Sequence, residues 1–504
     1  MSSALREIIP PTFTPVPSYQ PETVVDFTVV TSLSDNCDAM GIFVAAGSEP
    51  DQALGLSSDS LALAGFEGKE GQTLLIPSAS GTPLLYAIGV GARESLTADS
   101  FRAAAATLSR ATAKFAHVGV HVTETHSLDS ELLGQVLAEG FLLGRYRYNE
   151  LKSESTTVPL ATVEIKSDSS SGVTAGIARG VIAARGAMIA RDLANTPPGH
   201  LTATDFADVA LRLKDDFGLE VTIADKKKLV ELGCGGILGV NAGSAEEPRM
   251  ITLRYTPETG TTTGHIAMIG KGIMYDSGGI SLKPSDPMHL LMKMDMGGAA
   301  AIFGALTTLR DRGCTNTVTA FLMCTDNMPS GSAYKLGDVL TARGGKTVEV
   351  KNTDAEGRLV MMDGLALAAE QKPDVIVDIA TLTGAALMAL GPECAALLGN
   401  NQGVLDQLAA ASGATDEKVW QLPLEKKYRK LLDSDIADIA NLGGQFAGAT
   451  TAALFLNEFV AGIPWGHIDI AGTMQSAEDD GWRSKGATGF GARLLSEFAL
   501  GFRA

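Results

Sequence analysis

The chain has 504 residues, 45% of them hydrophobic, and its 58 Asp and Glu against 40 Lys and Arg give a net charge of −18. A chain of this length exceeds what one hydrophobic core usually serves, so two domains are expected. The acidic balance argues against nucleic-acid binding, which depends on clustered Lys and Arg. No stretch approaches the roughly 20 apolar residues needed to cross a bilayer, so no membrane-spanning segment is expected.

The glycines, cysteines and chain start are typical of an intracellular α/β protein. The 56 glycines, with only 6% aromatic residues, indicate tight turns and close contacts between helices and strands. The five cysteines are scattered without a C-x-x-C pair, which predicts buried thiols in a reducing cytosol. The proline-rich tail at 1–25 lacks a charged segment followed by an apolar core, so we expect no signal peptide and a cytoplasmic location.

Residues 26–172 predict a smaller N-terminal α/β domain, because strand-like runs alternate there with helical patterns. The expected strands are 26–32, 41–46, 84–90 and 118–122, and the expected helices are 100–114 and 130–146. A polar stretch at 166–172 ends this region. The Ala-rich helical pattern that follows predicts a linker helix over 173–194.

Residues 195–504 predict a larger α/β domain. A helix is expected at 203–217, and strands at 219–223, 251–255, 266–269, 318–323 and 374–380. The last two strands are followed by loops rich in Gly, Ser, Thr and Pro. An open sheet presents its ligand-binding loops at strand ends of this kind.

The segment 352–359 reads Asn-Thr-Asp-Ala-Glu-Gly-Arg-Leu. If it is extended, Asp354, Glu356 and Arg358 point to the same side. Two adjacent acids repel each other unless a cation or a shared proton relieves them, and one arginine cannot neutralise both. A metal site is one interpretation, and a solvated loop with Arg358 paired to one acid is the other. The regular elements expected at 360–370 and 374–380 favour the metal site, because they give the acids a scaffold.

A second cluster of acids and lysines follows the strand expected at 266–269. Its members are Lys271, Asp276, Lys283 and Asp295. The glycines beside Lys271 free the backbone to turn, whereas Gly297 and Gly298 predict a loop that enters a closely packed helix. With Asp354 and Glu356 there are four carboxylates, which suit a pair of divalent cations with mainly oxygen ligands.

Four ordered motifs resemble the leucyl aminopeptidase (cytosol aminopeptidase) family. They are G-K-G-I-M-Y-D-S-G-G-I-S-L-K at 270–283, D-M-G-G-A-A at 295–300, N-T-D-A-E-G-R-L at 352–359 and A-T-L-T-G-A at 380–385. The resemblance covers about 195–504. It implies a smaller N-terminal α/β domain joined by a helix to a larger α/β catalytic domain with a central mixed sheet. It also implies a metal-dependent aminopeptidase that removes N-terminal residues, preferably Leu or Met, from peptides.

The resemblance also implies the roles of individual residues. One divalent cation, Mn²⁺ or Zn²⁺, would be bound by Lys271, Asp276, Asp295 and Glu356, and a second by Asp276, Asp354 and Glu356. A metal-bound water or hydroxide would attack the first peptide bond. Lysine ligates only as a neutral amine, so the metal would hold the pKa of Lys271 far below its usual value of roughly 10.4.

Two further cations have implied roles that do not involve metal binding. Lys283 would stabilise the oxyanion of the tetrahedral intermediate. Arg358 would hold a bicarbonate ion as proton acceptor, helped by backbone N–H groups of Gly357 and Leu382.

The substrate's free amine would replace a metal-bound water, which restricts cleavage to the first residue. The implied pocket for its side chain is formed by Met292, Asn352, Thr381, Gly384, Ala471 and Met474. Ordinary packing is the alternative for the two methionines. The implied partners are small peptides and five further copies in a homo-hexamer, with no nucleic acid and no membrane.

Two other functions stay open at this point. Ser277 and the run Ser330-Gly331-Ser332 are candidate nucleophiles of a serine hydrolase, although neither lies in G-x-S-x-G. A DNA-binding accessory role is the second alternative, which the acidic composition disfavours. None of the seven histidines lies in the acidic motifs, so a histidine general base is not required.

Overall fold

The computed structural model describes residues 9–10, 12–77, 83–122, 128–154, 158–258, 260 and 262–504. Part of the proline-rich tail, 1–8 and 11, and His126 lie outside these residues. The chain forms two compact units, which are described separately. The small unit comprises 16–188 and 476–485, and the large unit comprises 1–15, 189–475 and 486–504.

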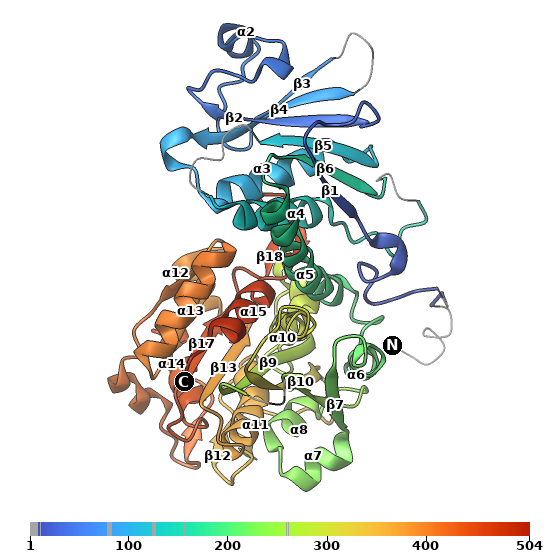
Figure 1. Ribbon diagram of the computed structural model, residues 1–504. Coiled ribbons are helices and arrows are strands. Elements are labelled where there is room, and N and C mark those ends of the chain that lie inside the picture. The colour runs from blue at the N-terminus through green and yellow to red at the C-terminus, as the bar shows by residue number, and fades with distance from the viewer. Residues whose placement is uncertain are drawn as a thin grey trace. The chain divides into compact units, whose positions relative to one another are not determined.

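The described part of the small unit contains a six-stranded sheet in the order β1-β6-β5-β2-β4-β3, parallel except for β3 (Figure 1). Its strands are β1 Asp26–Val30, β2 Ala39–Ala46, β3 Thr73–Ile76, β4 Leu84–Ala92, β5 His117–Val122 and β6 Thr162–Lys166. Its helices are α2 Ser58–Leu63, α3 Ala98–Ala111 and α4 Ser130–Arg145, with short 3₁₀ turns at η1 Pro21–Thr23, η2 Gln52–Leu54 and η3 Arg93–Ser95. The strands and helices expected here are confirmed, whereas β3, β6 and α2 were not predicted.

Helix α5, Ser170–Asn195, corrects one sequence expectation. Among the described residues it is the one helix that is long and apolar enough to cross a membrane. The search of the sequence for an unbroken run of apolar residues did not find it. Its apolar character comes from interspersed Ala, Gly, Val and Ile. In its most apolar window 56% is buried within the protein. A core helix has the same composition, so α5 does not indicate membrane insertion.

The large unit is built on a mixed sheet whose eight described strands run in the order β15-β14-β17-β13-β9-β10-β8-β7. Their bounds are β7 Leu219–Ala224, β8 Arg249–Tyr255, β9 His265–Asp276, β10 Thr317–Asn327, β13 Val375–Ala380, β14 Ala395–Gly399, β15 Val419–Gln421 and β17 Trp465–Asp469. The central strands β10, β9, β13 and β17 are mutually parallel, and β8 and β14 pair antiparallel on either side. The smaller strands are β11 Val339–Thr341, β12 Thr347–Glu349, β16 Ile439–Ala440, β18 Gln475–Ser476 and β19 Gly486–Ala487.

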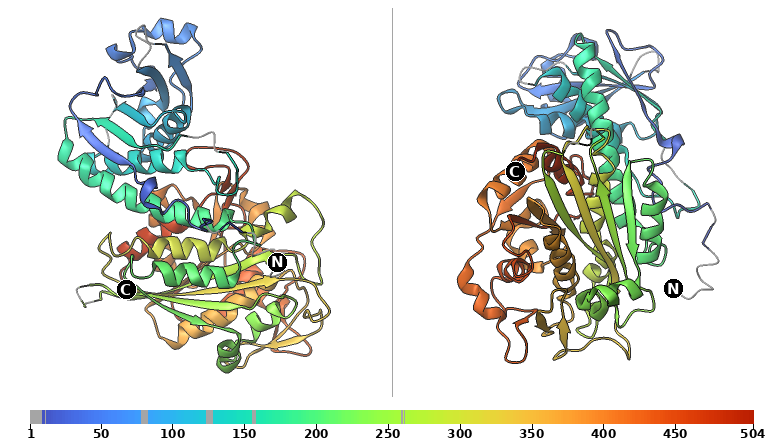
Figure 2. Two further views of the ribbon diagram at one scale, coloured as in Figure 1. Left: turned by 90° about the vertical axis from the view of Figure 1, so that its right-hand side faces the viewer. Right: turned by 60° about the horizontal axis from the view of Figure 1, so that its bottom comes forward.

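Helices cover both faces of this sheet (Figures 1 and 2). They are α6 Ala203–Leu213, α7 Lys226–Leu232, α8 Gly235–Asn241, α9 Pro287–Leu290, α10 Gly297–Leu306, α11 Glu356–Glu370, α12 Gly384–Leu390, α13 Gln402–Thr415, α14 Gly448–Asn457 and α15 Ala492–Gly501, with 3₁₀ turns η4 Leu291–Met294 and η5 Lys426–Leu432. Neighbouring strand residues face opposite sides. Ile269 therefore packs with α11, whereas a Cβ on Gly270 would lie 2.7 Å from Ala299 Cα of α10.

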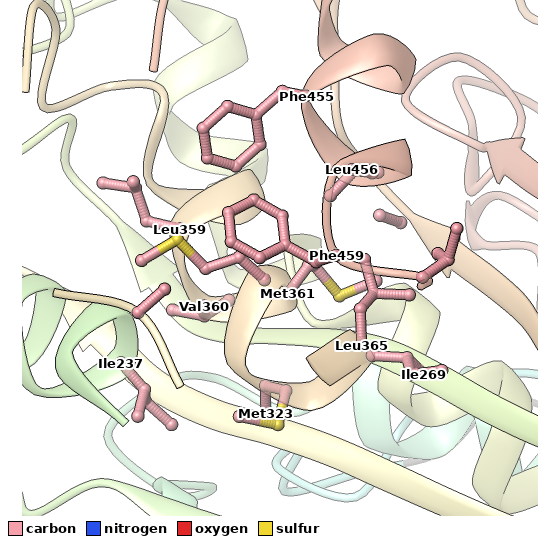
Figure 3. Packing of buried hydrophobic residues seen from close by; sticks show 14 of the residues in the cluster. Ile237, Ile269, Met323, Leu359, Val360, Met361, Leu365, Phe455, Leu456 and Phe459 are labelled. Carbon is pink, nitrogen blue, oxygen red and sulfur yellow. The ribbon is translucent and has the colours of Figure 1, made fainter. Parts of the chain in front are cut away.

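Helix α11 is fixed at the centre of the large core. Its Leu359, Met361 and Leu365 are fully buried. Figure 3 shows them between Ile269 and Met323 of the sheet and the aromatic side chains of α14 and its C-terminal end, Phe455 and Phe459. Removing any such side chain would leave a cavity that close packing cannot fill. The start of this helix is consequently held in a defined place.

Two sequence expectations about local structure are wrong. Residues 352–359 are not extended, because α11 begins at Glu356, four residues earlier than predicted, and Asp354 lies in the turn before it. Strand β9 extends to Asp276, so Lys271 lies inside a strand rather than in a loop. The glycines beside Lys271 serve close packing against neighbouring elements rather than a turn.

Asp363 links α11 to two other segments of the large unit. Its Oδ2 accepts the N–H groups of Gly236 and Ile237 at 2.8 and 3.0 Å, and its Oδ1 accepts that of Arg343 at 2.9 Å. In Asp363→Asn an amide donor would face a backbone donor, so we expect a loss of about 1–3 kcal/mol in the free energy of unfolding. Urea denaturation would measure this loss. Asp406→Asn on the exposed side of α13 is the matched control, and an equal effect in both variants would contradict the assignment.

Candidate active site

The predicted catalytic residues meet at one edge of the large sheet. Strands β9 and β13 are parallel neighbours, so their carboxyl ends lie at the same edge. Asp276 is the last residue of β9, and Thr381 and Leu382 follow β13 directly. The turn before α11 adds Asp354 and the helix start adds Glu356.

A cavity of about 350 Å³ opens at this edge. Among the residues predicted from the sequence, those that line it are Lys271, Asp276, Lys283, Met292, Asp295, Asp354, Glu356, Thr381, Leu382, Gly384, Ala471 and Met474. Acids and lysines therefore share one cavity with several apolar side chains. Asn352, Gly357 and Arg358 do not line it.

Asp276 at the end of β9 and Asp295 just after η4 each have one oxygen held by hydrogen bonds and the other directed at a lysine. Asp276 Oδ1 accepts from Asn327 Nδ2 at 2.8 Å and from the Gly278 N–H at 2.9 Å, while its Oδ2 lies 2.7 Å from Lys283 Nζ. Asp295 Oδ1 accepts from the Thr381 hydroxyl at 2.7 Å, and its Oδ2 lies 2.9 Å from Lys271 Nζ. The two carboxylates are thus oriented by partners that do not themselves carry charge.

Lys271 lies in the middle of this acidic cluster. Its Nζ is 2.8 Å from Glu356 Oε1 and 2.9 Å from Asp295 Oδ2, and it donates to the Thr381 carbonyl oxygen at 2.7 Å. Burial opposes its charge, but the carboxylates outweigh burial and raise the pKa of Lys271. The carboxylates alone cause this upward shift of the Lys271 pKa. A dication held by the same carboxylates would lower the pKa. The Lys271 side chain fits because Gly357 has no Cβ. A Cβ built there would lie 2.7 Å from Lys271 Nζ.

The carboxyl groups are crowded, and all but that of Asp354 are buried. Burial, followed by the charge of Asp276, raises the pKa of Glu356 to about 7, and the same two causes raise the pKa of Asp354. Burial raises the pKa of Asp295 well above its usual range. Lys283 Nζ offsets part of this charge from 2.7 Å to Asp276 Oδ2 and 2.5 Å to Asp354 Oδ1. Four carboxylates against two lysines leave the cluster short of positive charge.

These residues fit a pair of divalent cations. Single carboxylate oxygens of Asp276, Asp354 and Glu356 all lie within 4.8 Å of one another. Within the described part of the chain, the buried Glu356 Oε2 has no hydrogen-bond partner. A buried charged oxygen without a partner is costly, and a cation would satisfy it. The oxygen-rich donor set is the type that Mn²⁺, Mg²⁺ and Zn²⁺ accept.

Arg358 is buried on the first turn of α11, and no described carboxylate lies within ion-pair distance of it. Its Nη1 donates to the Asn441 carbonyl oxygen at 2.9 Å, while its Nε has no partner among the described residues. Burial lowers the pKa of Arg358 to about 10, which leaves it charged at neutral pH. The solvated-loop interpretation, with Arg358 paired to a neighbouring acid, is therefore wrong. The first N–H groups of a helix lack partners within it, so Arg358 and α11 together can hold an anion.

Two predicted residues are engaged differently from expectation. Asn352 accepts the Asp354 N–H on its Oδ1 at 2.8 Å, so its side chain shapes the turn. The Leu382 N–H, predicted to bind an anion, donates to Asp469 Oδ1 at 3.1 Å. An anion there would have to share this donor.

Several residues of the site carried no signal in the sequence. Asn327 and Tyr334 both donate to the Thr353 carbonyl oxygen, at 3.0 and 2.6 Å, and so position the turn that carries Asp354. Asn441 donates to the Asn352 carbonyl oxygen at 2.7 Å. His289 lines the cavity and stacks on Tyr275 with ring centroids 5.9 Å apart. Of these residues, only Asn327 had a position that could have suggested its role, because it lies four residues beyond the strand expected at 318–323.

The serine-hydrolase alternative finds no support in the geometry. The Ser277 hydroxyl donates to the Asn327 carbonyl oxygen at 2.6 Å, and Ser330 and Ser332 share a hydrogen bond of 3.0 Å. A nucleophilic serine needs a base within hydrogen-bond reach. None of these three hydroxyl groups has a histidine partner among the described residues.

Comparison with known proteins decides the family. The model of the cytosol aminopeptidase catalytic domain matches residues 188–496, and that of the N-terminal domain of the same family matches 42–155. The chain belongs to the cytosol aminopeptidase family. It is therefore a metallopeptidase of the leucyl aminopeptidase type, as the four motifs predicted, and the predicted α/β fold class is confirmed.

Relatives match almost the whole chain. A probable cytosol aminopeptidase of Alkaliphilus metalliredigens is 42% identical over 89% of this chain and 92% of the relative, and one of Chlorobaculum tepidum is 41% identical over 87% and 90%. The structure of the bottromycin maturation enzyme BotP in complex with Mn has 36% identity and a TM-score of 0.84, covering 92% of this chain and 99% of that chain. A mutant of tomato leucine aminopeptidase has 29% identity and a TM-score of 0.86, covering 95% and 96%.

Proposed function

We propose that this cytosol aminopeptidase removes Leu- or Met-like N-terminal residues from peptides with two divalent cations at the acidic edge of the large sheet. The observation that carries this proposal is the single cavity in which carboxylates held in place by hydrogen bonds meet an apolar wall. One cation would be held by Lys271, Asp276, Asp295 and Glu356, and the other by Asp276, Glu356 and the carboxylate and carbonyl oxygens of Asp354. Mn²⁺ or Zn²⁺ suits these ligands, and the similar BotP structure contains Mn.

Two cations of this kind, when bound, polarise the scissile carbonyl and supply a nucleophilic water at neutral pH. The protein's own groups then govern proton and charge movements. Lys283 Nζ, on the cavity wall, donates to the oxyanion that develops as the carbonyl carbon becomes tetrahedral. Arg358, at the start of α11, would hold a bicarbonate ion, which would supply a proton acceptor for the attacking water. A planar oxyanion matches the fork of a buried guanidinium.

Specificity for the first residue would follow from the substrate's free amine, which would take the place of a metal-bound water as a neutral nitrogen ligand. The nitrogen of a blocked N-terminus is an amide, which is a poor metal ligand, so a blocked peptide would not bind in this way. Met292, Thr381, Gly384, Ala471 and Met474 line the cavity beside the acids and form the site for the first side chain. Their apolar surface favours Leu and Met over charged residues. Asn352 does not line this cavity, and its side chain contributes only by shaping the turn that carries Asp354.

The remaining parts of the proposal rest on family resemblance and composition. The enzyme acts in the cytosol as a homo-hexamer on small peptides. Its net charge of −18 supports the absence of nucleic-acid binding. We further propose the division into tail 1–25, N-terminal domain 26–172, linker 173–194 and catalytic domain 195–504.

The test compares Leu-p-nitroanilide with its N-acetylated form, using protein stripped by a chelator and then reloaded with Mn²⁺ or Zn²⁺. We expect no activity in the stripped protein, recovery with either metal, and at least about 10²-fold slower cleavage of the blocked substrate. Equal cleavage of both substrates would contradict recognition of the free amine. Full activity after verified removal of the metals would contradict the proposed site.

A further inference from the structure

A second group of potential metal ligands lies in the small unit, unrelated to the catalytic residues. Among the described residues, the side chains of Cys37, His117 and Glu164 each offer one ligand atom, and these atoms lie within 4.8 Å of one another. The other such group in the described part of the chain is that of Asp276, Asp354 and Glu356. Only the first contains sulfur.

Three adjacent parallel strands bring these residues together. Cys37 precedes β2, His117 begins β5 and Glu164 lies in the middle of β6. In the sheet β6 pairs with β5 and β5 with β2, and Glu164 lies opposite Gly119. His117, Gly119 and Glu164 therefore face one side, because side chains alternate along a strand. The residues between them, among them Val118 and Val163, face the opposite side and belong to the hydrophobic core.

The space for the thiol depends on a glycine. A Cβ on Gly119 would lie 3.1 Å from Cys37 Sγ and 3.2 Å from Leu33 Cδ2. This glycine does not have a positive φ, so its role is to leave room rather than to permit a turn. The missing side chain forms a hollow in the sheet into which the segment before β2 places its thiol.

The three side chains are held in place by hydrogen bonds. Glu164 Oε2 accepts the Ser34 N–H at 2.8 Å, and its Oε1 lies 3.1 Å from His117 Nε2. Asp38 Oδ2 accepts the His117 N–H at 2.9 Å and fixes the start of β5. Cys37 is 1% exposed and Glu164 is 8% exposed. His117 is the one described side chain within ion-pair distance of this buried carboxylate.

This arrangement leaves a buried carboxylate beside a thiol without a permanent cation. We propose that Cys37, His117 and Glu164 supply three ligands of a site for one Zn²⁺-class cation in the small unit, with water as the fourth ligand. Sulfur, imidazole nitrogen and carboxylate oxygen together are the donor set that Zn²⁺ accepts and that Mg²⁺ and Ca²⁺ do not. The thiol releases its proton to solvent as the cation binds. The partly exposed His117 ring gives the cation access from solvent.

Covalent chemistry is the alternative for such a cysteine. Burial, followed by the charge of Glu164, raises the pKa of the Cys37 thiol to about 12. The nucleophilic and redox-active form of cysteine is the thiolate. Without a bound cation this group therefore stays a thiol at neutral pH, and the alternative finds no support.

The test uses the full-length protein loaded with Co²⁺. Among the described residues the catalytic group offers no sulfur, and Cys37 is the one free cysteine that lies in a group of potential metal ligands, so we assign a thiolate-to-cobalt charge-transfer band in the near ultraviolet to the Cys37 site. We expect the band in wild type, in Cys394→Ser and in Glu356→Ala, and its loss in Cys37→Ser together with one equivalent of bound metal. An unchanged band in Cys37→Ser would overturn the proposal, and so would loss of the band in either other variant.

A second measurement needs no variant and so does not depend on how Cys37→Ser folds. X-ray absorption of wild-type protein saturated with Zn²⁺ should show a sulfur shell at about 2.3 Å in addition to the nitrogen and oxygen shell. Scattering from nitrogen and oxygen only would overturn the proposal.

Discussion

Glu356→Ala is expected to abolish peptidase activity and to lower the metal content of the protein. Glu356 has one oxygen without any hydrogen-bond partner in the described structure and another 2.8 Å from Lys271 Nζ. Removal of residues that merely orient metal ligands commonly costs 10–100-fold, so loss of a ligand shared by two cations should exceed about 10²-fold. Steady-state kinetics and elemental analysis of the same samples would measure both effects.

The matched control for this variant is Glu370→Ala. Glu370 ends the same helix α11 and pairs with Arg343 at the surface, where an ion pair contributes little. We expect its activity and metal content to equal those of wild type. Wild-type metal content in Glu356→Ala would remove Glu356 from the ligand set.

Arg358→Ala is expected to keep both cations and to slow turnover by roughly 10²-fold, at the lower end of the range for groups that act in proton transfer. No described carboxylate lies within ion-pair distance of Arg358, so its removal changes none of the acids' hydrogen bonds. KM should change little, because the guanidinium does not line the cavity. Elemental analysis together with kcat and KM would separate these effects.

Added bicarbonate gives this prediction a sharper form. Wild-type kcat should rise with bicarbonate concentration, and that of Arg358→Ala should not. Arg343→Ala, which loses an ion pair with Glu370 and a hydrogen bond to the Leu232 carbonyl oxygen but no contact with the site, is the control and should respond like wild type. Metal loss in Arg358→Ala, or an equal bicarbonate response in all three proteins, would contradict the separate role of the arginine.

The sequence predicted acids that the structure brings together, but partly through an incorrect local structure. An extended 352–359 segment was expected to align its acids, whereas Asp354 lies in a turn and Glu356 begins a helix. The acids are close because the turn is tied to the segment just after β9, where the Thr353 hydroxyl donates to the Gly278 carbonyl oxygen at 2.7 Å. Hydrophobic periodicity cannot distinguish the two cases, because the start of a helix that is buried all round has no polar face to mark it.

The roles of the buried polar partners were also beyond prediction. Asn327 orients Asp276, Asn441 accepts from Arg358, and Thr381, expected only as a pocket residue, orients Asp295. Each lies at least 50 positions from its partner in the sequence. Asparagine and threonine are common on surfaces, so their types alone carry no signal. The Cys37 site escaped notice for the same reason, since its three residues come from widely separated segments.

The amino-acid sequence by itself determined the family, the α/β class and the acids, lysines and arginine of the site, because four ordered motifs depend on residue types and local spacing. The tertiary structure alone decided which oxygens stay free, which backbone groups are already occupied and where the cavity opens. These properties depend on contacts between distant segments. Sheet register and close packing set such contacts, and no local sequence pattern determines either of them.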